Sequence, residues 1–217
     1  MDAASNVPGV VMVAANVLVP NVVILDEDGK PLGTEEGGFT GGTAIGGDWP
    51  DPSFNPNVIA AGEEPIKSDE VAIDTGTADQ LGVVPGDTVT LLLPSGERRD
   101  FTLAGTTEAR AGSNFGVSFV YWSFPAAQQL LLEPGQATSL LVLAEPTASQ
   151  QAIADQIRPL LPPGVEAVTG DEIASQVSEQ LDTGLGFLNT FLLVFAIVSV
   201  FVATFLIYNT FSMLVAQ

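Results

Sequence analysis

The hydrophobic positions divide the chain into a long mixed segment and one almost wholly apolar run near its end. Residues 187–215 (FLNTFLLVFAIVSVFVATFLIYNTFSMLV) carry no charged side chain, and Asp182 is the last charged residue. A bilayer core needs about 20 apolar residues, and a helix rises about 1.5 Å per residue. The run is therefore long enough to cross a membrane with tilt. Buried helices of soluble proteins seldom run this long without a charge.

Before this run, short apolar segments alternate with turn residues, a pattern that predicts a mixed α+β domain. The predicted strands are short and lie within 10–26 and at 70–74, 88–93, 98–104, 115–122, 137–143 and 165–168. The predicted helices lie at 75–81, where Thr75 caps the start and Gly82 the end, and at 125–132 and 147–158. The part over 70–104 is hairpin-rich, and 137–168 is βαβ-like. Residues 33–57 are rich in Gly, Pro, Asp and Asn, which predicts a long surface loop.

A further helix is expected to begin near Asp171 and to continue into the apolar run. Thr169-Gly-Asp-Glu172 resembles a capping box, and no proline follows it before the run. Gly184 and Gly186 fall at the expected water–lipid boundary, and each costs roughly 1 kcal/mol of helix stability relative to Ala. We therefore predict a domain over 1–169, a stalk helix over 170–186 with a hinge at these glycines, and a membrane helix over 187–215.

One face of the expected membrane helix carries small and weakly polar side chains. They are spaced by three, four and seven residues or their sums: Asn189, Ala196, Ser199, Ala203 and Thr210. Side chains of this kind let helices approach closely in lipid. We predict that this face packs against another membrane helix, although small residues are common in membrane spans.

Charge and composition exclude several classes of function. The chain has 6 Lys and Arg against 26 Asp and Glu, for a net charge of -20. Such a field repels phosphate backbones, so no nucleic-acid partner is expected. The chain has no His and no Cys, which removes the usual zinc, haem, Cys–His and Ser–His–Asp chemistry. No cofactor and no metal site are expected.

The charges beside the apolar run predict its orientation. Four acidic residues lie just before it: Asp171, Glu172, Glu179 and Asp182. The nearest basic residue on that side is Arg158, whereas cytoplasmic flanks normally carry Lys or Arg. Residues 1–182 are therefore expected outside the plasma membrane, with Gln217 on the cytoplasmic side.

The ends of the chain are unlike those of a complete exported protein. The first ten residues, MDAASNVPGV, lack the basic and apolar regions of a signal peptide. No basic flank follows the apolar run to hold its end inside. We expect this chain to be part of a larger polytopic protein, with one span before it and further segments after it.

Two Asp-Thr-Gly segments raise the possibility of acid protease chemistry, which needs two aspartates sharing a proton. Asp74-Thr-Gly-Thr-Ala resembles the aspartic-protease signature, and a second Asp-Thr-Gly begins at Asp182. The second segment lies in a predicted helix beside the membrane, and Leu185-Gly186 follow where a hydroxyl and a small residue are needed. The favoured interpretation is that Asp74 ends a strand and Thr75 caps the start of a helix.

Three other patterns have simpler interpretations. Residues 24–35 copy part of a calcium loop, but Ile24 stands where an oxygen ligand is required and Pro31 interrupts the loop, so a turn at Asp28-Gly29 is favoured. The glycines of 37–42 lack the Lys of a phosphate loop. Aromatic residues gather between 119 and 124, where core or sheet-face positions are favoured over a ligand platform: Phe119, Tyr121, Trp122 and Phe124.

Taken in order, several segments resemble the extracytoplasmic domain of the FtsX-like permeases of ABC transporters, of the MacB and lipoprotein-release type. Residues 70–74 (EVAID) and 78–91 (ADQLGVVPGDTVTL) carry the resemblance, 28–32 (DGKPL) fits the early hairpin, and 161–172 (LPPGVEAVTGDE) fits the end of that domain.

The apolar part is similar to the second membrane helix of that family, through 186–190 (GFLNT) and 205–217 (FLIYNTFSMLVAQ). The resemblance covers nearly the whole chain, with a poor match over 33–57. It implies a cytoplasmic ABC ATPase as a separate subunit or domain, and a second permease copy or homologous permease half. It also implies that the Asp74 stretch is structural and that the missing spans lie before and after this chain.

The function expected on these grounds is that of a transport component without a catalytic site of its own. The outer domain would couple cytoplasmic ATP hydrolysis to export or to lipoprotein or lipid release. Two alternatives stay open: a membrane-anchored aspartic hydrolase using Asp74 and Asp182, and a membrane-anchored binding or sensor module.

Overall fold

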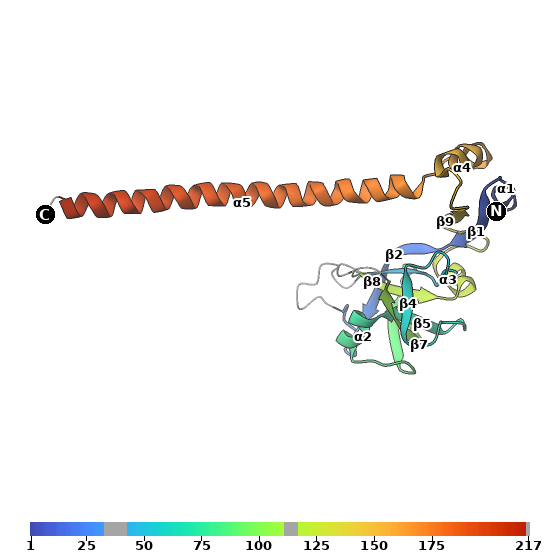
Figure 1. The fold of residues 1–217 in the computed structure, drawn as a ribbon. Coiled ribbons are helices and arrows are strands. Elements are labelled where there is room, and N and C mark those ends of the chain that lie inside the picture. Colours follow the sequence, from blue (N-terminus) through green and yellow to red (C-terminus); the bar gives the residue numbers. More distant parts are fainter. Residues whose placement is uncertain (33–42, 111–116, 216–217) are drawn as a thin grey trace. The chain divides into compact units, whose positions relative to one another are not determined.

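The computed structural model describes the backbone of residues 1–32, 43–110 and 117–215. Side chains are described over the same ranges except at 177–189 and 215. Figure 1 shows the course of the chain, with the strands in the first two thirds and helices after them.

The chain comprises two compact units, Met1–Ala148 and Ser149–Gln217. The first holds every strand of the described part, and the second holds three helical segments. This composition confirms the predicted α+β class followed by one long apolar helix.

A barrel-like sheet forms the larger part of the first unit. Its strands are β2 (Leu18–Leu25), β3 (Thr43–Asp48), β4 (Asn57–Gly62), β5 (Glu70–Asp74), β6 (Thr88–Leu92), β7 (Arg98–Ala109) and β8 (Ser118–Trp122). The order is β4-β7-β5-β8-β3-β2-β6, and β6 also pairs with β7. Six strands therefore close on themselves, and β4 lies outside the ring beside β7.

Strand β7 is long enough to serve two neighbours along one edge. It pairs antiparallel with β6 over Arg98–Thr102 and with β4 over Gly105–Ala109, while β5 runs parallel to it on the other edge. The predicted end at residue 104 is therefore too early. Continued pairing accounts for the difference, because Thr106 and Thr107 are buried between β4 and β5 although threonine is polar.

Alternating side chains of the strands fill the barrel. In β6, Val89 and Leu91 are almost fully buried while their neighbours are more exposed, as the period of a strand requires. Trp122 is the largest fully buried side chain, and its ring meets Phe101 edge-on at 5.6 Å between centroids. The aliphatic and aromatic residues that predicted strands thus also make the core.

The β6–β7 hairpin and helix α2 form where the sequence predicts them. Strands β6 and β7 join through the turn Pro94-Ser95-Gly96, and helix α2 spans Thr75–Leu81. Gly82 ends α2 in the left-handed conformation, with φ of 70°. The cap at the start is Asp74 rather than Thr75, because the Asp74 carboxylate accepts from the backbone amide of Thr77.

The prediction of a loop over 33–57 is wrong at 43–48, whereas residues 49–56 form no helix or strand. Strand β3 occupies the centre of the barrel sheet, and β4 begins at Asn57. The glycines there mark close packing: a Cβ on Gly46 would lie 2.5 Å from Val22 Cγ2, and one on Gly47 would lie 2.6 Å from the carbonyl oxygen of Val17. Residues 33–42 lie outside the described part.

A separate two-stranded sheet joins β1 (Val10–Asn16) antiparallel to β9 (Ser139–Ala144). The short helix α1 (Asp2–Ser5) precedes β1. Helix α3 (Phe124–Leu131) follows β8 and precedes β9 along the chain. It buries Ala126 and Ala127 against the barrel core.

The second unit begins with α4 (Gln150–Ile157) and the 3-10 turn η1 (Arg158–Leu160), and continues as α5 (Gly170–Val215). Residues 165–168 form no strand, which corrects the βαβ-like prediction for 137–168. Val165 and Val168 stay about half exposed, so burial does not reinforce their β propensity.

Candidate functional site

Asp74 lies where β5 ends and α2 begins. Its Oδ1 accepts from the Thr77 amide at 2.9 Å, and its Oδ2 accepts from the Thr77 hydroxyl at 2.8 Å and from the Phe119 amide at 3.1 Å. Both carboxylate oxygens therefore hold α2 and β8 in place. This arrangement supports a structural role for Asp74.

Asp182, the second aspartate of the hydrolase alternative, lies within α5 in the second unit. Its side chain is outside the described part, as is that of Asn189, and the surroundings of Gly184 are not described either. The pairing of Asp74 with Asp182 therefore stays a hypothesis.

The aromatic residues between 119 and 124 occupy core and sheet-face positions, as predicted. Trp122 points into the barrel core, whereas Phe119 and Tyr121 stack in parallel at 5.8 Å between ring centroids. The Tyr121 hydroxyl accepts from Asn57 Nδ2 at 2.7 Å. Burial, aided by the charge of Asp74, raises the pKa of Tyr121 well above its ordinary value, so the phenol stays protonated.

The start of α5 is fixed by the predicted capping box. Thr169 Oγ1 accepts from the Glu172 amide at 3.2 Å, and a Glu172 carboxylate oxygen accepts from the Thr169 amide at 2.9 Å. The next amide, that of Gly170, donates to Gln150 Oε1 of α4 at 3.0 Å. These bonds satisfy amides that a helix start otherwise leaves unpaired.

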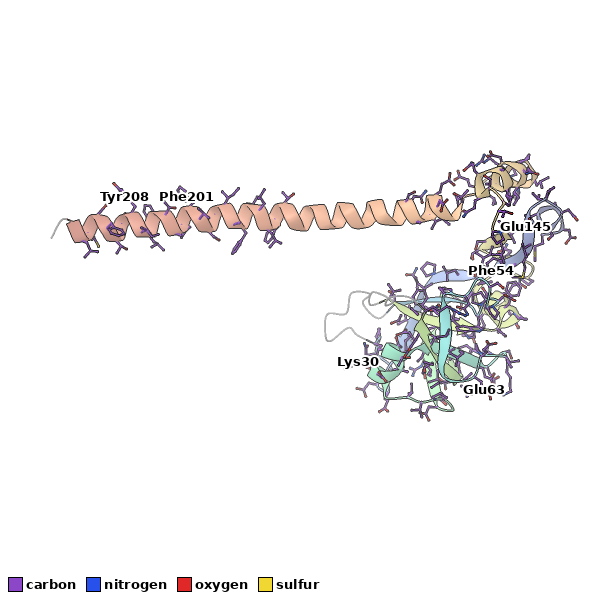
Figure 2. All side chains as sticks on the ribbon, in the orientation of Figure 1. Lys30, Phe54, Glu63, Glu145, Phe201 and Tyr208 are labelled. Atoms are coloured by element: carbon purple, nitrogen blue, oxygen red, sulfur yellow. The ribbon has the colours of Figure 1, made fainter. Side chains whose placement is uncertain are left out.

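From this cap, α5 continues without a break for 46 residues, through Gly184 and Gly186 to Val215. Its portion Thr190–Leu214 is long and apolar enough to cross a membrane, with a mean hydropathy of 2.8. None of that window is buried, and Figure 2 shows Phe201 and Tyr208 projecting from the helix. The rest of this unit thus leaves the apolar surface uncovered.

Of the residues predicted to pack against another membrane helix, the structure describes Ala196, Ser199, Ala203 and Thr210, and all are exposed. The hydroxyls of Ser199 and Thr210 each donate at 2.8 Å to the carbonyl four residues earlier. These hydroxyls are therefore satisfied within the helix. Packing by this face stays a prediction.

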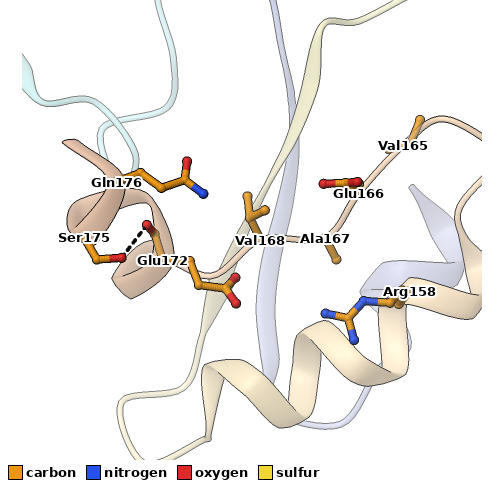
Figure 3. A pocket seen from close by; sticks show the side chains of 8 residues that line it. All are labelled: Arg158, Val165, Glu166, Ala167, Val168, Glu172, Ser175 and Gln176. Atoms are coloured by element: carbon orange, nitrogen blue, oxygen red, sulfur yellow. Dashed lines mark hydrogen bonds between the residues drawn. The ribbon is translucent and has the colours of Figure 1, made fainter. Parts of the chain in front are cut away.

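A pocket of about 430 Å³ lies against the first turns of α5 (Figure 3). Its lining combines η1, the segment 165–168 and α5. Arg158 is bound to Asp155 at 2.6 Å, and Glu172 is held by the capping box. The Arg158 contact is thus local to α4 and η1, and the Glu172 contact fixes the start of α5.

Sequence reasoning missed a set of contacts where the chain passes from the two-stranded sheet into the barrel. We call this place, residues 16–18, the crossing. Val17 alone separates β1 from β2 and is fully buried. Its amide donates to Asp48 Oδ1 at 2.6 Å, and its carbonyl accepts from the Asp48 amide at 3.0 Å. Burial is the largest influence on Asp48 and raises the pKa of its carboxyl, although the Val17 amide opposes the shift.

A second contact of this crossing joins it to the start of β9. The Thr138 hydroxyl accepts from the Leu18 amide at 2.8 Å and donates to the Asn16 carbonyl at 2.9 Å. The Thr138 amide donates to the same carbonyl at 2.9 Å. Asp48, from the barrel, and Thr138, from the connection to β9, thus hold three consecutive residues of the crossing between them.

A family model described as the MacB-like periplasmic core domain matches residues 1–160, well over half of the chain. The chain belongs to this family. A MacB-like periplasmic core domain is part of an ABC transporter permease, and such domains are typically non-catalytic. The resemblance drawn from residues 70–91 is therefore confirmed, and membership implies an ATPase partner.

Solved structures of low sequence identity share the fold. One is the extracellular domain of the noncanonic ABC-type transporter YknZ from Gram-positive bacteria, with 14% identity, a TM-score of 0.51, and coverage of 74% of this chain and 79% of that one. Another is the periplasmic region of MacB from Actinobacillus actinomycetemcomitans, with 13% identity, a TM-score of 0.51, and coverage of 82% and 80%. No curated protein sequence matches the chain.

The calcium-loop pattern of the sequence takes its simpler interpretation, a turn, in this MacB-like domain. Ile24 is buried in the barrel, and Asp26 Oδ1 accepts from the Lys30 amide in a turn that places Gly29 at φ of 77°. In the described ranges no three acidic side chains are grouped to hold a metal ion. The glycines of 37–42 lie outside those ranges. The domain is of the periplasmic or extracellular type, followed by a candidate membrane helix at the cell membrane.

Proposed function

We propose that this chain couples ATP hydrolysis in the cytoplasm to the export of a substrate, or to the release of lipoprotein or lipid, outside the cell. The observation that carries the proposal is the continuity of α5, which runs unbroken from its cap at Thr169 to the end of the apolar window. A rigid helix can transmit a displacement between a membrane and a folded domain, whereas a flexible linker cannot.

The partners follow from this arrangement. We assign residues 1–182 to the outside and Gln217 to the cytoplasmic side, with a domain over 1–169, a stalk over 170–186 and a membrane helix over 187–215. The proposed partners are a cytoplasmic ABC ATPase subunit, a second permease copy or homologous half, and the lipid bilayer.

The proposal is tested by interrupting α5 in the complete permease. A flexible Gly-Ser insertion of about ten residues after Thr183 should abolish transport driven by ATP while the outer domain still folds, since such a linker behaves as a random coil. The same insertion after Ser95, in an exposed hairpin turn, is the matched control and should be tolerated. Transport at the parental rate after the Thr183 insertion would show a passive binding module instead.

The hydrolase alternative is tested at Asp74. Asn in place of Asp74 retains an acceptor for the Thr77 amide but cannot share an acid proton, so Asp74→Asn should leave transport nearly intact. Complete loss of activity in a well-folded Asp74→Asn permease would support catalysis.

A further inference from the structure

The order of the elements leaves one covalent route from α5 back to the barrel. The chain leaves the barrel at β8, passes through α3, and reaches β9 at Ser139 before it continues into α4 and α5. A displacement of α5 carried back along the chain therefore passes α4 and then enters the first unit at β9, next to the crossing. The β1–β9 sheet is small, and a two-stranded sheet is only marginally stable by itself.

The crossing is built to resist relative movement of the sheet and the barrel. Asn16, Val17 and Leu18 each have a backbone group bound by a side chain or amide from elsewhere in the fold: Asn16 and Leu18 by Thr138, and Val17 twice by Asp48. We call these five residues the Val17 joint. The chain has no spare length there, because one residue separates the two strands.

Burial strengthens the contact made by Asp48. Val17 is fully buried and Asp48 is 4% exposed, so water does not compete well for the Val17 amide. Gly47 closes the space, because a Cβ there would lie 2.6 Å from the Val17 carbonyl oxygen. Thr138 is exposed, so its contribution is expected to be the smaller one.

We propose that the Val17 joint locks the β1–β9 sheet to the barrel, so that the two move as one body when α5 is displaced. This inference rests on the proposed function for the displacement itself. It assigns to Asp48 and Thr138 the role of positioning residues in the outer part of the permease.

The test measures the distance between the sheet and the barrel in the complete permease with its ATPase, made free of other cysteines. Spin labels are placed on cysteines at Ser95, in the β6–β7 turn, and at Leu140, in β9. The distance distribution should be narrow and the same with and without ATP. In Asp48→Ala it should broaden, and the Val17 amide should exchange its hydrogen about tenfold faster, as for the loss of one hydrogen bond. Asp48→Asn, which keeps an acceptor, should behave as the parent.

Thr138 provides a second pair of variants at an exposed position, where misfolding is not expected. Thr138→Val removes the hydroxyl at nearly constant size and should speed exchange of the Leu18 amide, whereas Thr138→Ser should restore protection. A parental Ser95–Leu140 distance that changes with ATP would overturn the proposal. So would an unchanged distance distribution and unchanged exchange in both Asp48→Ala and Thr138→Val.

A second label pair separates this inference from the function on which it rests. Labels at Ser95 and Ser178 report whether ATP moves α5 relative to the barrel. An ATP-independent distance for that pair counts against the proposed function. The broadening expected in Asp48→Ala needs no ATP, and so it supports or overturns the lock whichever way the second pair behaves.

Discussion

Asp48 combines almost complete burial with a carboxylate, a side chain that favours water. Its contacts are with the backbone at Val17, and its burial raises the pKa of the carboxyl above the ordinary value of 3.8. The folded state therefore binds a proton more tightly than the unfolded state does. Stability from this group is present below pH 3.8 and is lost as the pH rises through the folded-state pKa.

The first prediction concerns the pH dependence of this effect. Asp48→Asn keeps the acceptor for Val17 and removes the charge, so the parent should lose stability relative to Asp48→Asn as the pH rises from the ordinary value of 3.8 through the raised pKa of the folded state. Urea unfolding of both proteins in detergent across this range measures the difference in free energy of unfolding. A difference independent of pH would show that Asp48 titrates normally in the fold.

The second prediction concerns Gly46, whose neighbours leave no room for a methyl group. A Cβ would lie 2.5 Å from Val22 and 3.0 Å from Trp122, so Gly46→Ala should lower the free energy of unfolding by about 1–3 kcal/mol. Gly76→Ala is the control, because its Cβ would meet only Asp74 Oδ1 at 3.4 Å and a helical Ala is favoured by up to about 1 kcal/mol. Equal effects of the two changes on thermal unfolding would refute the packing argument.

Contacts between neighbours in the sequence could be predicted, and contacts between distant residues could not. The capping box joins Thr169 to Glu172, three residues apart, and its local pattern identifies it. The start of α2 was likewise predicted to within one residue, although the cap is Asp74 and not Thr75. The bond from Leu18 to Thr138 spans 120 residues, and nothing at either position distinguishes it in advance.

Among the elements, the strands with alternating aliphatic residues were predicted, whereas β3 was mistaken for a loop. Its sequence, TAIGGD, has the composition of a loop, and the reason for its glycines is visible only when β2 and Trp122 are packed against them. At 165–168 a strand was predicted where none forms, because here too the sequence does not show which residues pack against the segment. Local β propensity decides little without a neighbouring strand and a buried face.

The third prediction belongs to α5, where two glycines interrupt an otherwise helix-favouring sequence without breaking the helix. Replacing Gly184 and Gly186 together by Ala should stabilise the helix there by about 2 kcal/mol, since each glycine costs about 1 kcal/mol. Hydrogen exchange over 180–190 should slow, and transport per ATP hydrolysed should change if this boundary bends during the cycle. Slower exchange with unchanged transport would argue against a hinge at these glycines.

For the whole molecule, the fourth prediction tests orientation. Cysteines placed at Ser5 and Ser178 of the complete permease should react with an impermeant maleimide on intact cells, because acidic residues and no basic residue flank the apolar window on that side. A cysteine at Gln217 is the control and should react only after the membrane is opened. Protection of both Ser5 and Ser178 would reverse the orientation.

The place where β1 meets β9 has a consequence for how such a domain can be rebuilt. The Thr138 amide donates to the Asn16 carbonyl. The residue before the barrel segment and the residue at its end are therefore joined by a hydrogen bond. The barrel is thus an insertion between two paired strands, and a domain whose two ends lie close together can be excised as a unit. Residues 17–138 should therefore fold when expressed alone, whereas β1 and β9 joined by a short turn should pair only marginally, because a two-stranded sheet is marginally stable by itself.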